Sequence, residues 1–197
     1  ALEVLRQPME DGELTISRAT SRVRYPASTM LVAAMNPCPC GYYGSSTHQC
    51  SCSPKQVAAY LSRVSGPLID RFDIHCRLNP VDFSSISSSR KEESSAEIRE
   101  RVQRAREIQN QRYKDSGISC NAYIPDSIIN EVCVVTPQGQ EVLKGAFDRL
   151  GLSARGYNRI LKLSRTIADM EGSQLIEREH VACAVQFRSL DRQFKGK

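Results

Sequence analysis

The stretch NPCPCGYYGSSTHQCSC, residues 36–52, places four cysteines within fifteen residues. They form two C-x-C pairs, Cys38 with Cys40 and Cys50 with Cys52, and nine residues separate the pairs. The surrounding residues are glycine, serine, tyrosine and proline, and a loop of this polarity cannot bury four thiols in a core. Four thiolates placed tetrahedrally around Zn²⁺, at about 2.3 Å, would satisfy the sulfurs and order the loop. We therefore expect a structural zinc site at these cysteines.

Reduced free thiols and disulfides are the alternatives to zinc at these positions. Structural zinc sites usually hold two to four residues within a ligand pair, whereas each pair here holds one. Gly41 allows a tight turn behind Cys40. His48, in the same loop, could replace one of the cysteines as a zinc ligand. Four cysteine ligands would leave no open coordination position, so we do not expect a catalytic zinc. The remaining cysteines fit buried free thiols: Cys76, Cys120, Cys133 and Cys183.

The composition and charge limit where the protein can be located and what it can bind. The net charge of +5 permits an anionic partner without requiring one. No apolar stretch approaches the roughly 20 residues that span a bilayer, and the start of the chain does not resemble a signal peptide. We therefore expect a cytoplasmic protein with reduced thiols. The first residue is not Met and the chain opens inside a helical pattern, which we interpret as a fragment of a longer protein.

The first part of the chain reads as an α/β structure. A helix is expected over 1–9, followed by a hairpin from two alternating segments, 13–18 and 21–25. Arg18, Arg22 and Arg24 make this hairpin basic, although a merely solvated edge hairpin gives the same pattern. The apolar run STMLVAAM, 28–35, predicts a strand covered on both faces, as in a parallel sheet. A second strand is expected over DIHCRL, 73–78, with Ile74, Cys76 and Leu78 on one face.

The first part also contains a capped helix, and the second part reads as entirely helical. The helix of the first part, with a Ser53 cap, Pro54 in its first turn and Gln56 completing a capping box, is expected to run to about Val64. The serine-rich residues 83–95 read as a linker, so that 1–82 and 96–197 form the two parts. Periodicity and capping residues predict helices over 96–114, 125–134, 137–150, 154–171 and 177–188.

Five segments together resemble the ComM/YifB group of magnesium-chelatase-like AAA+ ATPases. They occur in the order of that family: LRQPMEDGELTISRA, LVAAMNPCPCGYYG, YLSRVSGPLIDRFDIH, SARGYNRILKLSRTIADMEG and RSLDR. The resemblance implies the C-terminal half of an AAA+ α/β subdomain followed by a helical lid. In the family, the Walker A and Walker B motifs lie upstream, and this chain contains no G-x-x-x-x-G-K-[ST]. We therefore expect no ATP hydrolysis by these residues alone, and ATP with Mg²⁺ as cofactors of the parent.

The resemblance also implies roles for individual residues. Asn36 corresponds to sensor 1, which orients the attacking water, although an Asn before Pro is also a common turn residue. Arg71 corresponds to the arginine finger that acts on a neighbouring subunit's γ-phosphate; the alternative is a pair with Asp70 or Asp73. Arg155 corresponds to sensor 2, with Arg159 one turn later as the alternative.

The function implied by the resemblance is work on DNA. Relatives of this kind act as hexameric helicases that drive branch migration in natural transformation, and the basic hairpin occupies the position of a pre-sensor-1 hairpin facing the pore. Arg18, Arg22 and Arg24 would then follow a phosphate backbone without reading sequence. Two other readings stay open. One is a chelatase-type subunit that remodels a metal-insertion partner, and the other is a non-enzymatic zinc-stabilised module that binds DNA or protein.

Overall fold

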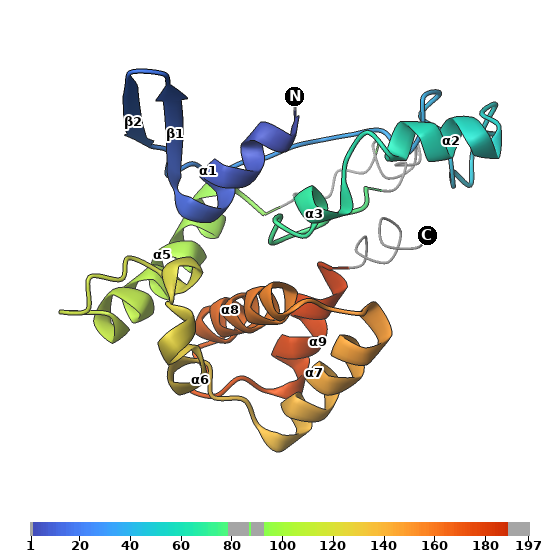
Figure 1. The fold of residues 1–197 in the computed structure, drawn as a ribbon. Helices are drawn as coiled ribbons and strands as arrows, with labels where there is room; N and C mark the ends of the chain where they lie inside the picture. Colours follow the sequence, from blue (N-terminus) through green and yellow to red (C-terminus); the bar gives the residue numbers. More distant parts are fainter. Residues whose placement is uncertain (1, 79–86, 88–92, 189–197) are drawn as a thin grey trace. The chain divides into compact units, whose positions relative to one another are not determined.

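The computed structural model describes residues 2–78, 87 and 93–188 (Figure 1). These residues fall into two compact units, of which the first holds 2–72 and 77–78 and the second holds 73–76, 87 and 93–188. The structure is mixed but rich in helix, with a small sheet. Most of the predicted linker, 83–95, and part of the terminal RSLDR segment lie outside the described residues. No helix in the described ranges is long and apolar enough to cross a membrane.

The first unit opens with a helical turn and a hairpin, as predicted. A 3-10 helix, η1, covers Leu2–Leu5 and leads into α1, Arg6–Asp11, which ends at Gly12. Strand β1, Glu13–Arg18, then pairs antiparallel with β2, Ser21–Pro26, through a two-residue connection. In this register Ile16 lies opposite Val23, on a face of the ribbon that is apolar except at its tip.

The strand expected over 28–35, of the kind found in a parallel sheet, and the strand expected over 73–78 do not form, and this part of the prediction was wrong. Residues 28–35 and 73–78 have no regular secondary structure. Most of their apolar residues are exposed, with Met30 at 91%, Val32 at 82% and Leu78 at 91% of full exposure. A strand is stable only where a neighbour accepts and donates its backbone hydrogen bonds. Within the described residues only β1 and β2 pair in a sheet, so these two runs have no ladder to join.

Two short helices follow the cysteine-rich loop. Helix α2 covers Pro54–Leu61, and its predicted capping box is confirmed: Gln56 N–H donates to Ser53 Oγ at 3.3 Å, and Ser53 N–H donates to Gln56 Oε1 at 2.8 Å. The helix ends at Leu61, just short of the expected Val64. Helix α3, Gly66–Ile69, buries Leu68 and Ile69.

The second unit is a small helical bundle (Figure 1). Its elements are α5 (Ser95–Arg112), η2 (Asn121–Tyr123), η3 (Asp126–Ile128), α6 (Ile129–Val132), α7 (Pro137–Leu150), α8 (Ala154–Met170) and α9 (Arg178–Gln186). The predicted helices are confirmed to within a few residues, except that the one expected over 125–134 divides into η3 and α6. The apolar core includes Ile124, Leu143, Ile160, Leu161, Ile176 and Val181.

A buried polar network joins α5, η2 and α8. The Asp169 carboxylate is fully buried and accepts hydrogen bonds from Arg112 (2.8 and 2.5 Å), Arg165 (3.0 Å) and Asn121 (2.8 Å). The Tyr113 hydroxyl donates to Asn121 Oδ1 at 2.6 Å. Because a buried charge is tolerated only when it is paired and hydrogen-bonded, this network fixes the position of α5 against α8.

Candidate functional site

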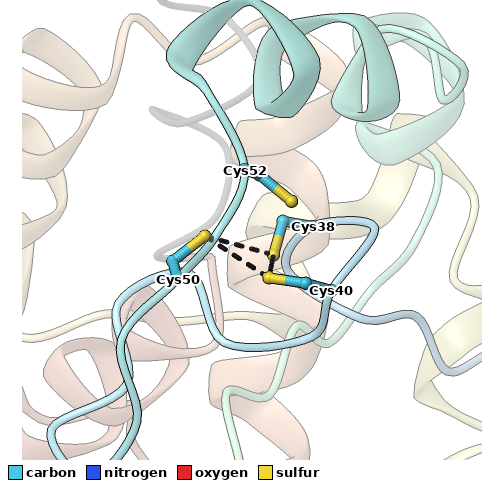
Figure 2. Close-up of side chains that lie close together, drawn as sticks. All are labelled: Cys38, Cys40, Cys50 and Cys52. Atoms are coloured by element: carbon cyan, nitrogen blue, oxygen red, sulfur yellow. Dashed lines mark hydrogen bonds between the residues drawn. The ribbon is translucent and has the colours of Figure 1, made fainter.

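The four cysteines predicted as metal ligands converge (Figure 2). Cys38 Sγ lies 3.3 Å from Cys40 Sγ and 3.7 Å from Cys50 Sγ, and the last two are 3.5 Å apart. With Cys52, all four sulfurs lie within 4.8 Å of one another. Sulfurs at about 2.3 Å from one tetrahedral Zn²⁺ would be about 3.8 Å apart. The cluster therefore has the dimensions of a four-thiolate metal centre.

Two consecutive turns bring the ligands together. Gly41 N–H donates to the Cys38 carbonyl at 3.1 Å, and Ser45 N–H donates to the Tyr42 carbonyl at 3.0 Å. Gly41 and Gly44 have φ of +86° and +75°, a conformation that favours glycine. The first turn reverses the chain after Cys40, as Gly41 suggested.

The second limb of the loop is held by the helix that follows it. It carries Cys50 and Cys52 directly into the Ser53 cap of α2. The capping box therefore anchors the chain directly after the second C-x-C pair. Figure 2 shows the ribbon running from Cys52 into this helix.

The protonation of the cluster is uneven. A hydrogen bond from the Tyr42 backbone N–H is the main cause that lowers the pKa of Cys40 to about 5. The Cys52 N–H has the same effect on Cys50, but burial and the adjacent Cys40 and Cys38 sulfurs outweigh it and raise the pKa of Cys50 to about 12. One ionised thiol thus opposes ionisation of the next. A divalent cation would remove this opposition and let all four sulfurs ionise.

His48, the substitute ligand, lies outside the cluster that could hold a metal. Its Nδ1 is 3.0 Å from Thr47 Oγ1, and its ring stacks on Tyr42 with centroids 4.8 Å apart. The Tyr43 backbone N–H instead donates to Cys38 Sγ at 3.3 Å. Such a bond to a ligand sulfur is typical of the outer shell of a metal site, and the sequence pattern gave no sign of it.

The remaining cysteines differ in exposure. Cys133 is buried as predicted, and burial raises the pKa of its thiol to about 11. Cys120 and Cys183 are partly buried. Cys76 is exposed, which contradicts the prediction, because the strand that was to bury it does not form.

Arg71 is buried and held by three hydrogen bonds. Its Nε donates to Glu10 Oε2 at 3.0 Å, its Nη2 reaches the same oxygen, and its Nη1 donates to the Pro67 carbonyl at 2.7 Å. The side chain is 8% exposed, against 32% for that of Glu10. The partner is therefore a carboxylate of α1, which the sequence did not suggest.

The other residues expected to act on nucleotide are more exposed. Asn36 is exposed, and a Cβ built at Gly41 would lie 4.0 Å from its amide. Arg155 is exposed in the first turn of α8. Arg159, one turn later, forms an ion pair with Asp73. Asn36 and Arg71 belong to the first unit and Arg155 to the second.

The three hairpin arginines are all exposed, but they do not share a face. In the antiparallel register, Arg22 lies opposite Ser17 and Arg24 opposite Thr15, so both point to the polar face. Arg18 lies opposite Ser21 at the tip and points to the other face. Arg24 also approaches Glu13 at 3.8 Å, and both side chains are exposed.

Comparison of the sequence with known proteins identifies its family. A family model described as magnesium chelatase, subunit ChlI, matches residues 1–86, and one described as the ChlI C-terminal region matches residues 92–188. The chain belongs to the magnesium-chelatase-like AAA+ family.

Within that family the similarity is to the ComM and YifB proteins. The chain is 43% identical to the competence protein ComM of Haemophilus influenzae and 39% identical to the uncharacterized protein YifB of Escherichia coli. It is 35% identical to the uncharacterized protein Rv2897c of Mycobacterium tuberculosis. These matches cover 97%, 97% and 95% of the chain, but 36%, 37% and 37% of the relatives. The chain thus spans little more than a third of their length.

Proposed function

We propose that the whole protein is a cytoplasmic, ring-forming AAA+ ATPase that couples ATP hydrolysis to the remodelling of DNA. Its role would be branch migration during natural transformation or recombination, with a hexamer as the working form. The observation that carries this proposal is the 43% identity to the competence protein ComM along nearly the entire chain. Hydrolysis would need a Walker A loop, which these residues lack, so the present chain alone is expected to be inactive.

Three residues would act on nucleotide in the ring. The Asn36 amide would orient the attacking water, and Arg155 would couple the angle of the helical lid to the state of the phosphates. Arg71 would enter a neighbouring subunit's site and stabilise the charge that develops on the γ-phosphate. In the single chain Arg71 is instead bound to Glu10, so assembly of the ring would have to exchange this partner for a phosphate.

The finger role can be separated from a structural role of the Arg71–Glu10 pair. Arg71→Ala in the whole protein is expected to lower ATP turnover by about 10³-fold or more, while nucleotide binding survives. Mixing Arg71→Ala subunits with subunits that lack the Walker lysine should restore part of the turnover, because the finger acts across the interface. Glu10→Gln is the matched control, since it breaks the same ion pair without removing the finger.

Two outcomes count against the finger. If Glu10→Gln lowers turnover as far as Arg71→Ala does, Arg71 serves the fold of the first unit. Near-normal turnover of Arg71→Ala alone would likewise exclude a finger at this position.

The cysteine cluster would hold one structural Zn²⁺ through Cys38, Cys40, Cys50 and Cys52. Four soft sulfurs at tetrahedral spacing suit this ion, and they leave no position for substrate. Protein prepared under reducing conditions without chelator should contain about one zinc per chain. Replacing Cys50 by Ser should release it, whereas replacing the buried Cys133 by Ser should not. A full zinc content in the Cys50 variant, or no zinc in the wild type, would contradict the assignment.

A chelatase-type motor is the second candidate. It is favoured by the family description itself, which names magnesium chelatase. It predicts hydrolysis that responds to a protein partner and not to DNA. A non-enzymatic zinc-stabilised module predicts binding without any need for nucleotide. The two C-x-C pairs support the ComM-like reading, because the resemblance assigns them to that group.

A further inference from the structure

A long stretch of the first unit carries no acidic residue. From Leu14 to Ile69 there is no Asp or Glu. The basic residues in the same stretch are Arg18, Arg22, Arg24, Lys55 and Arg63. Their five charges equal the net charge of the entire chain, +5. Four of the seven tyrosines also lie here: Tyr25, Tyr42, Tyr43 and Tyr60. Basic and aromatic residues without carboxylates are the composition that suits single-stranded nucleic acid.

Within this stretch, the backbone of Tyr42 and Tyr43 is held in place by contacts of the cysteine loop. The Tyr43 N–H donates to Cys38 Sγ at 3.3 Å, and the Tyr42 carbonyl accepts a hydrogen bond from the Ser45 N–H at 3.0 Å. Gly41 and Gly44 flank the pair and supply the turns on either side. The two tyrosine side chains are nevertheless 45% and 46% exposed. The backbone that carries the rings is therefore ordered before any ligand arrives, and the Tyr42 ring is further positioned by its stack on His48. This order reduces the entropy lost on binding.

A guanidinium lies at the turn that follows these two tyrosines. Arg77 Nη2 is 3.4 Å from the Gly44 carbonyl, and a Cβ at Gly44 would come within 2.5 Å of the same nitrogen. Arg77 thus packs across the turn that follows Tyr43, and it remains exposed. Four thiolates around one divalent cation would carry a formal charge of −2, so charge alone does not favour a polyanion at this loop. Stacking has to supply most of the affinity.

We propose that the cysteine loop is a second nucleic-acid contact, in which Tyr42 and Tyr43 stack on bases of a single strand and Arg77 binds the adjacent phosphate. This inference depends on the proposed function in one respect, namely that the partner is DNA. Residues 36–52 contain no Leu, Ile, Val or Phe, so the loop offers a protein partner no aliphatic surface. What it exposes is aromatic rings, each with a face on which any base can stack.

The test uses the whole protein and a fluorescent 20-nucleotide oligo-dT. The paired substitution Tyr42→Leu/Tyr43→Leu is expected to weaken binding at least about fivefold, because a stacked base contributes that much or more. Tyr42→Phe/Tyr43→Phe keeps the rings and should bind within about twofold of wild type. Tyr123→Leu removes a ring of 58% exposure from the second unit and should have no effect. Zinc content, measured for each variant, shows whether the cluster is intact.

The salt dependence separates this contact from the hairpin. The leucine pair removes no charge, so the slope of log affinity against log salt should stay unchanged, whereas Arg77→Gln should lower it by about one. Arg77→Gln also tests the loop if the leucine pair loses its zinc. Wild-type affinity in both the leucine pair and Arg77→Gln overturns the proposal, while weakened binding in hairpin variants would leave the proposed function standing. The proposal would also be overturned if the leucine pair changed the mass of the oligomer but not the affinity for DNA. In that case the tyrosine rings would contact another copy of the protein.

Discussion

At the scale of single residues, Asp169 shows what a sequence cannot reveal. Along α8 it reads as one more polar residue near a helix end. In the structure it is fully buried and binds Arg112, which lies 57 positions earlier, as well as Arg165 one turn away. The same holds for Arg71 and Glu10, which are 61 positions apart. Local spacing identified the cysteines because their ligand set is local, and it missed these pairs because the fold creates them.

Removing the Asp169 charge should strongly destabilise the second unit. Asp169→Asn would leave the buried Arg165 and the largely buried Arg112 without a counter-charge, at a cost of about 3 kcal/mol or more in the free energy of unfolding. Glu100→Gln is the control, because it breaks an exposed pair with Arg104 and should cost less than about 0.5 kcal/mol. Urea unfolding at pH 7 measures both. Equal stability of the two variants would show that the network contributes little.

The same residue makes the stability depend on pH. Burial opposes ionisation of Asp169, but hydrogen bonds from Arg112 and Asn121 and the nearby guanidinium charges outweigh it and lower its pKa. Because the folded-state pKa lies below the unfolded value, the contribution is complete above about pH 4 and is lost as the pH falls further. The gap in stability between wild type and Asp169→Asn should therefore narrow below about pH 4. A constant gap down to pH 2 would contradict this.

At the scale of elements, the helices and the hairpin followed from the sequence, whereas the two strands expected over 28–35 and 73–78 did not form. The Ser53 cap and the bounds of α7 were predicted because capping and periodicity act within a few residues. The hairpin was predicted for the same reason, since its two strands are adjacent. The apolar run 28–35 has the composition of a buried strand, but a strand of a parallel sheet needs partners from elsewhere in a chain. Apart from the partly buried Leu31, its residues are exposed here.

Helix α7 contains two glycines that should respond oppositely to alanine. A Cβ at Gly139 would lie 2.7 Å from Val135 Cγ1 and 3.3 Å from the Ile176 carbonyl, whereas nothing lies within 4 Å of one at Gly145. Gly139→Ala should therefore destabilise the unit by about 1–3 kcal/mol through overpacking. Gly145→Ala should stabilise it by about 0.5–1 kcal/mol, because alanine is the better helix former. Thermal unfolding compares the two, and a shift of the same sign in both would contradict the packing argument.

At the scale of the whole molecule, the family followed from five short segments in order, and the comparisons confirmed it. The coarse fold, with a small sheet in a helix-rich chain, was also within reach of the sequence. The contacts of the proposed ring were not, because they would involve other subunits. Resemblance therefore supplied the proposed roles of Asn36, Arg71 and Arg155, and chemistry supplied the proposed role of the cysteines.

The central claim is that DNA in the ring drives a nucleotide cycle, and the most direct measurement is ATP hydrolysis by the whole protein with and without a branched DNA. Arg22 and Arg24 share the exposed polar face of the hairpin, so replacing both by Ala should abolish stimulation by DNA and leave basal turnover intact. It should also lower the salt slope of DNA binding by about two, since two phosphate contacts are lost. Arg99→Ala, at an exposed position of α5 in the second unit, is the control. The account predicts hydrolysis that rises with DNA in the wild type and in the control but not in the double variant. The account would be contradicted if DNA did not change the rate of ATP hydrolysis by the wild type. It would also be contradicted if DNA still stimulated hydrolysis by the double variant.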